Sequence, residues 1–211
     1  SRSITISFLV TFFTILTTYP VAYYVAFYVK KNKILWIILM TIPFWTSYLL
    51  RVFAWKLILG NSGVINASLI SVGLTDEPLS YLMYSQLSVV ITLCHAWSAF
   101  ALLPLFVSLD KIDHSLIEAS RDLGCSKFET FIRVTFPLSL PGVIGAILII
   151  FIPTVGDFVT PALVGGTEGR MLSNMIQAYF GRVNNFSLGA ASAVIMLFSV
   201  IVVTIIVNFV T

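Results

Sequence analysis

Long apolar runs separated by shorter polar connections make up most of this chain. A helix needs about 20 apolar residues to cross roughly 30 Å of hydrocarbon, because each residue advances the helix by about 1.5 Å. Five runs reach that length, at residues 4–29, 34–59, 85–109, 138–160 and 188–211. The pattern therefore predicts an all-α, polytopic membrane helix bundle with five spans, in a single transmembrane domain over residues 1–211.

The composition agrees with that interpretation. The 211 residues are 58% hydrophobic and 10% charged, whereas soluble domains carry about 25% charged residues. The formal net charge of +3 is small, so we expect a lipid membrane as the surroundings and no nucleic-acid partner. Cys94 lies in an apolar run and Cys125 in a polar connection. The two cysteines predict neither a disulfide framework nor a metal site.

Basic residues are unevenly distributed among the connections. They occur at Lys30, Lys31 and Lys33 in the first connection and at Lys111, Arg121, Lys127 and Arg133 in the third. The second connection, 61–84, contains neither Lys nor Arg. Because Lys and Arg concentrate on the cytoplasmic side of membrane proteins, the first and third connections are predicted to be cytoplasmic. Ser1 and the 161–187 connection are then outside, and Thr211 is inside.

The third connection, 110–137, holds the one long polar segment of the chain. Two short helices are predicted in it, each opened by a capping box of serine and glutamate: Ser115 with Glu118, and Ser126 with Glu129. Gly124 lies between them, where a glycine can adopt the left-handed conformation that ends a helix. Pro137 is predicted to end the second helix before the next apolar run.

One face of the first short helix has a distinct pattern. Residues three or four apart share a helix face, which here groups Leu116, Ala119, Ser120 and Leu123. Small side chains in the middle and larger apolar ones at the ends suit a knob that enters a groove on another protein. The residues alone leave a second interpretation open, in which the segment is an ordinary solvated loop between two spans.

Asp157 is the acidic residue closest to the membrane interior, near the outer end of its span. Ionisable residues at membrane depth usually face a cavity or a partner, whereas the position near the outer end of the span favours a helix-end carboxylate in water. Several aromatic residues lie in the middle or outer half of their spans, at Trp45, Tyr48 and Trp97. They predict an interfacial belt or helix packing or, together with Asp157, a site for an organic cation.

Signatures of enzymes are missing from the sequence. It contains no HExxH zinc motif, no GxSxG nucleophile elbow and no GxxxxGK[ST] phosphate loop. No catalytic residues are therefore predicted, and the chain is expected to bind no cofactor itself. If ATP drives this protein, another subunit must bind the nucleotide.

The polar segment resembles a known signature. The residues Glu118, Ala119, Ser120 and Gly124, followed by Val134 and Pro137, resemble the cytoplasmic loop of permease subunits of bacterial binding-protein-dependent ABC importers. This chain has Ser120 where the signature has alanine and Val134 where it has isoleucine. Three stretches, 42–51, 116–142 and 156–166, are also similar to permeases of the spermidine/putrescine importer family, in the same order.

The resemblance implies a multi-pass permease subunit in the bacterial inner (cytoplasmic) membrane, with the type I importer fold. It implies that the subunit forms half of a translocation pathway for polyamines and works by alternating access. The implied partners are a cytoplasmic ABC ATPase that binds ATP and Mg, a second and different homologous permease, and an extracytoplasmic solute-binding protein. The family's first helix and C-terminal tail are expected to be absent from these 211 residues.

The resemblance also assigns roles to residues. The residues implied in ATPase coupling are Leu116, Glu118, Ala119, Ser120, Leu123, Gly124 and Pro137. The substrate pathway is expected to involve Asp157, Trp45, Tyr48 and Trp97. Two alternatives remain at this point: a permease of a related importer for another small solute, and an ATP-independent channel or carrier.

Overall fold

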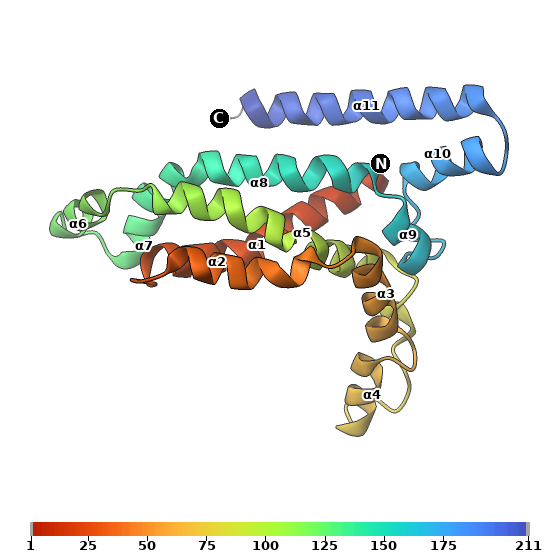
Figure 1. Cartoon of the computed structure of the whole chain (residues 1–211), viewed down its shortest axis with the longest axis horizontal. Helices are drawn as coiled ribbons and strands as arrows, with labels where there is room; N and C mark the ends of the chain where they lie inside the picture. The colour runs from red at the N-terminus through yellow and green to blue at the C-terminus, as the bar shows by residue number, and fades with distance from the viewer. Residues whose placement is uncertain (1, 210–211) are drawn as a thin grey trace.

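In the computed structural model, residues 2–209 are described, and every regular element in that range is helical (Figure 1). The α-helices are α1 (Arg2–Phe27), α2 (Lys33–Thr41), α3 (Tyr48–Leu59), α4 (Val64–Ser71), α5 (Gln86–Asp110), α6 (His114–Asp122), α7 (Lys127–Thr130), α8 (Phe136–Gly156), α9 (Val159–Val164), α10 (Leu172–Gly181) and α11 (Phe186–Phe209). Two 3-10 turns, Ile42–Trp45 and Ser80–Leu82, and a π-helical turn, Phe131–Thr135, complete the set. The predicted all-α class is confirmed.

The centre of the bundle is formed by α1, α5 and α8, which lie side by side in Figure 1. Their facing side chains are fully buried, among them Val10, Leu93, Leu105 and Ile150. Ser139 of α8 adds polar contacts to this core. Its Oγ lies 2.8 Å from the Tyr19 hydroxyl of α1, and its carbonyl oxygen accepts from the Ser108 hydroxyl of α5 at 3.3 Å.

Gly142 of α8 lies at a close approach of α5. A Cβ atom at this position would lie 2.3 Å from the Cβ of Ser108 and 2.6 Å from the carbonyl oxygen of Pro104. Both distances are far inside van der Waals contact, so only glycine fits. Small residues allow membrane helices to approach closely and thereby pack with more atoms in contact.

Four helical stretches are long and apolar enough to cross a membrane. They are Arg2–Phe27, Gln86–Asp110, Lys127–Gly156 and Phe186–Val207. These stretches overlap four of the five predicted runs, although the exact bounds of the spans stay predictions. Ser1 and Thr211, whose sides were predicted from the charge distribution, lie outside the described residues.

The fifth predicted run, 34–59, is not one straight helix. Its first part, α2 with the following 3-10 turn, meets the α3–α4 segment at an angle of 80°. Pro43 is the second residue of the 3-10 turn, and Thr46 and Ser47 then adopt extended conformations with ψ of 157° and 135°. A proline cannot donate a backbone hydrogen bond, so the helix tightens and then ends. In Figure 1, α3 and α4 project away from the bundle at the end opposite to α6.

The polar loop contains the two short helices that the sequence predicts. Ser126 and Glu129 form the predicted capping box at the start of α7, and Gly124 has the expected left-handed φ of +86°. The box predicted at Ser115 is wrong. Asp113 is the N-cap residue of α6 instead, and its side chain accepts a hydrogen bond from the backbone N–H of Ser115. The helix therefore begins at His114, earlier than predicted.

Pro137 does not end the second short helix, so that prediction is wrong. One continuous helical stretch runs from Lys127 to Gly156 and includes α7, the π-helical turn and α8. The backbone N–H of Phe136 bonds to the carbonyl oxygen of Phe131, five residues back. A π-helical turn is wider than an α-helical turn, and it lets the chain continue as a helix through Pro137.

Candidate functional site

The helices α6 and α7 lie beyond one end of the bundle, past the ends of α5 and α8 (Figure 1). Apolar side chains on and just after α6 are exposed: Leu116 and Ala119 lie on the helix, and Leu123, which follows its last residue, is 86% exposed. Glu118 and Gly124, which also belong to the signature, are exposed as well. The loop therefore presents an apolar surface with no covering element in residues 2–209.

Ser120 occupies a different position from the other residues of the predicted face. It is 8% exposed, and its Oγ lies 2.8 Å from the Oγ1 of Thr130 on α7, which is also buried. The Ser120 hydroxyl also lies 3.0 Å from the carbonyl oxygen of Ile117. Ser120 thus joins α6 to α7 and does not lie on the exposed surface with Leu116 and Ala119.

Phe128 belongs to the exposed part of the loop, and sequence reasoning missed it. This phenylalanine of α7 is 70% exposed. A large apolar residue that lies just behind the Ser126 cap of a polar helix is the signal that could have identified it. We call Leu116, Ala119, Leu123 and Phe128 the apolar set of the loop.

The start of α6 is held in a defined position. The Oδ1 atom of Asp113 accepts from the Ser115 N–H at 2.9 Å, and this hydrogen bond lowers the pKa of the Asp113 carboxyl below its usual value. Ile112 is buried in the core, and the ring of His114 packs edge-on against the ring of Phe27 with a centroid distance of 5.6 Å. These contacts fix the first turn of α6 to the core and to the end of α1.

A second group of predicted residues meets at the other end of the bundle. The Tyr48 hydroxyl donates to the Oδ2 atom of Asp157 at 2.5 Å and lies 2.5 Å from the Oγ1 of Thr160. The Oδ1 atom of Asp157 accepts from the backbone N–H groups of Val159 at 2.9 Å and Thr160 at 3.4 Å. The Ser173 hydroxyl donates to the Asp157 carbonyl oxygen at 2.6 Å.

The aromatic residues of the predicted pathway lie at different distances from this carboxylate. The Trp97 ring lies 6.4 Å from the Tyr48 ring, measured between centroids. Trp45 lies at the bend between α2 and α3 and is 80% exposed. The structure thus brings Asp157, Tyr48 and Trp97 into one cluster and leaves the side chain of Trp45 directed into the surroundings.

Arg51 is a further member of this cluster. Its guanidinium lies over the rings of Phe44 at 5.5 Å and Tyr48 at 5.9 Å, and it donates to the carbonyl oxygen of Ala96 at 3.3 Å. The cluster therefore contains one carboxylate and one cation with aromatic faces beside them. A carboxylate oxygen can accept two hydrogen bonds, so the Oδ2 atom of Asp157 retains room for one further donor.

The described residues contain no group of three or more His, Cys, Asp or Glu side chains that could hold a metal ion. Cys94 and Cys125 are both free thiols.

Comparison with known proteins adds a family to this geometry. Over residues 3–211 the chain matches the family described as binding-protein-dependent transport system inner membrane component. It is similar to the spermidine/putrescine transport system permease protein PotB of Escherichia coli strain K12, with 33% identity over 193 residues, 92% of this chain and 70% of that protein. The inner membrane ABC transporter permease protein YdcU of the same strain is 32% identical over 203 residues, 90% of this chain and 64% of YdcU.

A solved structure shares the fold. A bacterial ABC transporter involved in the import of the acidic polysaccharide alginate matches with a TM-score of 0.71 and 15% identity, over 99% of this chain and 77% of that one. The same transporter in complex with an alginate pentasaccharide-bound periplasmic protein matches with a TM-score of 0.73 and 16% identity. At such identities the similarity shows the fold, which is that of an ABC importer permease.

Proposed function

This chain belongs to the family of inner membrane components of binding-protein-dependent transport systems, and from that premise we propose that it forms half of the translocation pathway of an ATP-driven polyamine importer. The chain is a permease subunit of an ABC importer, located in the bacterial inner membrane. The partners, the coupling to ATP and the substrate are proposed in addition to this family assignment.

The exposed apolar set of the loop is the observation that carries the proposal. Leu123 and Phe128 are 86% and 70% exposed beyond the end of the bundle, in a segment too polar to lie in hydrocarbon. Apolar side chains in such a place are stabilised when another protein covers them. The partner proposed here is a cytoplasmic ABC ATPase that binds ATP and Mg and whose groove receives α6.

The loop is also connected in a way that can transmit motion from the ATPase to a membrane span. The Ser120–Thr130 hydrogen bond joins α6 to α7, and α7 continues without a break into α8. A displacement of α6 by the ATPase therefore reaches a membrane span directly. In the proposed cycle, closure of two ATPases pushes the loops of two permeases together and tips the spans from an inward-open to an outward-open arrangement.

Two further partners complete the proposed assembly. One is a second permease, a different but homologous chain, because a single bundle supplies half of the pathway. The other is an extracytoplasmic solute-binding protein, supported by the family description and by the alginate transporter that was solved with its periplasmic protein. It would approach the end of the bundle opposite to α6, where α3, α4, α9 and α10 lie (Figure 1).

A polyamine is the proposed substrate, because the permeases PotB with 33% identity are named for spermidine and putrescine transport. The cluster of Asp157, Tyr48 and Trp97 is consistent with such a substrate. A carboxylate oxygen with free acceptor capacity beside aromatic faces attracts an organic ammonium group. Arg51 in the same cluster limits the attraction, so we expect this subunit to supply one contact to the amine rather than a strongly acidic channel.

The coupling part of the proposal is tested by the substitution Leu123→Asp in the full-length permease. A charge in the apolar set must be desolvated on docking, so we expect ATP-dependent spermidine uptake to fall about tenfold or more, since a loss of about 1.4 kcal/mol in docking free energy already weakens binding tenfold. The measurement uses the permease with its partner permease, ATPase and binding protein in proteoliposomes. Co-purification of the ATPase is expected to weaken in parallel.

Leu123→Met is the matched control for this experiment. Methionine keeps an apolar side chain of similar size at the same position, so uptake and ATPase retention should stay near the parental values. Parental uptake and ATPase retention in Leu123→Asp would contradict the coupling role. Uptake that needs no ATPase would favour a channel or carrier, and uptake of another solute in place of spermidine would favour a related importer.

A further inference from the structure

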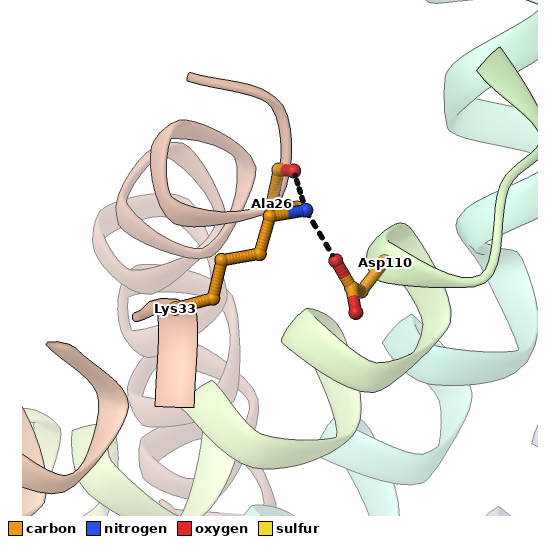
Figure 2. Close-up of polar contacts among 3 residues, drawn as sticks. All are labelled: Ala26, Lys33 and Asp110. Atoms are coloured by element: carbon orange, nitrogen blue, oxygen red, sulfur yellow. Dashed lines mark hydrogen bonds and ion pairs between the residues drawn. The ribbon is translucent and has the colours of Figure 1, made fainter. Parts of the chain in front are cut away.

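Lys33, the first residue of α2, contacts the C-terminal ends of two other helices, α1 and α5 (Figure 2). Its Nζ atom donates to the carbonyl oxygen of Ala26, in the last turn of α1, at 2.6 Å. It also donates to the Oδ1 atom of Asp110, the last residue of α5, at 2.6 Å. Figure 2 shows the ammonium between these two acceptors. One side chain therefore joins α1, α2 and α5.

The charges of this contact have the wrong sign for their own helices. A helix carries partial positive charge at its N-terminus and partial negative charge at its C-terminus. Lys33 places a cation at the N-terminus of α2, and Asp110 places an anion at the C-terminus of α5. Each is unfavourable locally, and each becomes favourable only across helices, because the ammonium meets the carboxylate and the free C-terminal carbonyl of Ala26. These residues therefore serve the contact between helices.

The contact lies directly beside the loop. Three residues separate Asp110 from His114, where α6 begins. The middle one, Ile112, is buried in the core, and His114 itself packs on Phe27 at the end of α1. The start of α6 is thus attached to the ends of both α1 and α5, at the place where Lys33 holds these two ends together.

From this geometry we propose that Lys33 is a positioning residue. It keeps the C-terminal ends of α1 and α5 and the N-terminal end of α2 together, so that a displacement of α6 moves all three helices. The inference rests on the proposed function, because it concerns how the ATPase stroke is transmitted. Side chains of Lys33 and Asp110 are 29% and 38% exposed. Such a pair contributes little to overall stability, so its loss should affect the transmission of motion more than folding.

The test compares transport with ATP hydrolysis in one preparation. The full-length permease, assembled with its partner permease, ATPase and binding protein in proteoliposomes, is studied as Lys33→Gln and as Asp110→Asn. We expect ATP hydrolysis to continue while spermidine transported per ATP hydrolysed falls about threefold in each variant, in line with the strength of a partly exposed ion pair. The double variant Lys33→Asp with Asp110→Lys should recover part of the loss, because the ion pair is restored with its charges exchanged.

Lys31→Gln is the matched control, since Lys31 is an exposed lysine of the same connection and its removal changes the net charge equally. This control should keep the parental ratio of transport to hydrolysis. A parental ratio in Lys33→Gln would overturn the inference. So would equal loss of assembly in Lys33→Gln and in the charge-exchanged variant, because that result would make the role structural. Absence of ATP-dependent transport in the parent would instead refute the proposed function.

Discussion

The carboxylate of Asp157 accepts one hydrogen bond from a distant residue and two from near neighbours. Tyr48 is 109 positions away in the sequence, whereas Val159 and Thr160 are two and three positions away. The local bonds form an Asx-type turn just before α9, whose N-cap residue is Phe158. The distant bond attaches α3 to the end of α8. One residue therefore stabilises a turn, joins two elements and retains acceptor capacity on Oδ2.

This arrangement makes Asp157→Asn an informative substitution. The asparagine oxygen can still accept from the Val159 N–H, and its amide can donate to the Tyr48 hydroxyl, so the fold should be retained. The negative charge is lost, and charge-assisted hydrogen bonds are about twice as strong as neutral ones. We expect the KM for spermidine uptake to rise, with assembly unchanged in size-exclusion chromatography.

Asp157→Ala provides the comparison for that experiment, because it removes the bonds to Val159, Thr160 and Tyr48 and should also lower the free energy of unfolding by about 1–3 kcal/mol. Unchanged uptake kinetics in Asp157→Asn would remove Asp157 from the substrate pathway and leave it with a structural role.

Individual capping residues were only partly predictable from the sequence. Ser126 was identified correctly, because it is the one cap candidate just before its helix and Glu129 follows at the required spacing. In the other helix both Asp113 and Ser115 are good N-cap residues. The glutamate three residues after Ser115 favoured the wrong one, and only the backbone conformation of Asp113, with ψ of 122°, distinguishes them.

At the scale of elements, hydrophobic length predicted α1, α5, α8 and α11 but could not predict the bend after α2. The run 34–59 is mostly apolar, with Arg51 and Lys56 as its charged residues, and such a run is equally compatible with one straight helix or two shorter ones. Pro43 was a visible signal of irregularity, yet prolines in α1, α5 and α8 lie within continuous helices. The extended conformations of Thr46 and Ser47 decide the outcome, and they depend on the packing of α3.

The packing of α5 against α8 leads to a prediction about two glycines of one helix. A Cβ at Gly142 would lie 2.3 Å from that of Ser108, whereas a Cβ at Gly145 would lie 3.5 Å from that of Pro104. We expect Gly142→Ala to destabilise the protein by about 1–3 kcal/mol through overpacking. Gly145→Ala should be neutral or stabilise it by up to roughly 1 kcal/mol, because alanine favours helix.

Thermal unfolding of both variants in the same detergent measures this difference. The two substitutions add the same methyl group to α8, so a lower midpoint for Gly145→Ala than for Gly142→Ala would show that α5 and α8 are packed differently from the arrangement described here.

At the scale of the whole molecule, the charge distribution and the arrangement of elements agree on a direction. The basic connections 28–32 and 111–135 lie at the same end of the bundle as α6 and α7, and α9 and α10 lie at the other (Figure 1). The positive-inside rule predicts that the first end is cytoplasmic. Contacts between distant residues, such as Lys33 with Asp110 across 77 positions, carry no sequence pattern, which is why they were not predicted.

This orientation can be tested by labelling Cys125, a free thiol of the loop. In a variant whose other cysteines are replaced, we expect a membrane-impermeant maleimide to label Cys125 in inside-out vesicles and not in right-side-out vesicles. The matched variant retains no native cysteine and carries Ser71→Cys, an exposed residue at the end of α4. It should show the reverse, and labelling of both from one side would refute the orientation.

The bend after α2 has a consequence for the biosynthesis of the protein. The stretch Lys33–Trp45 advances only about 20 Å at the usual rise of a helix, less than the hydrocarbon thickness of roughly 30 Å. α11 is long and apolar enough to partition into the bilayer by itself, but α2 is not. α2 contacts both α1 and α5, and these contacts are needed to hold it in the membrane. α5 has not yet been synthesised when α2 leaves the ribosome. We therefore expect insertion of this segment to be completed only after α5 has followed it into the membrane.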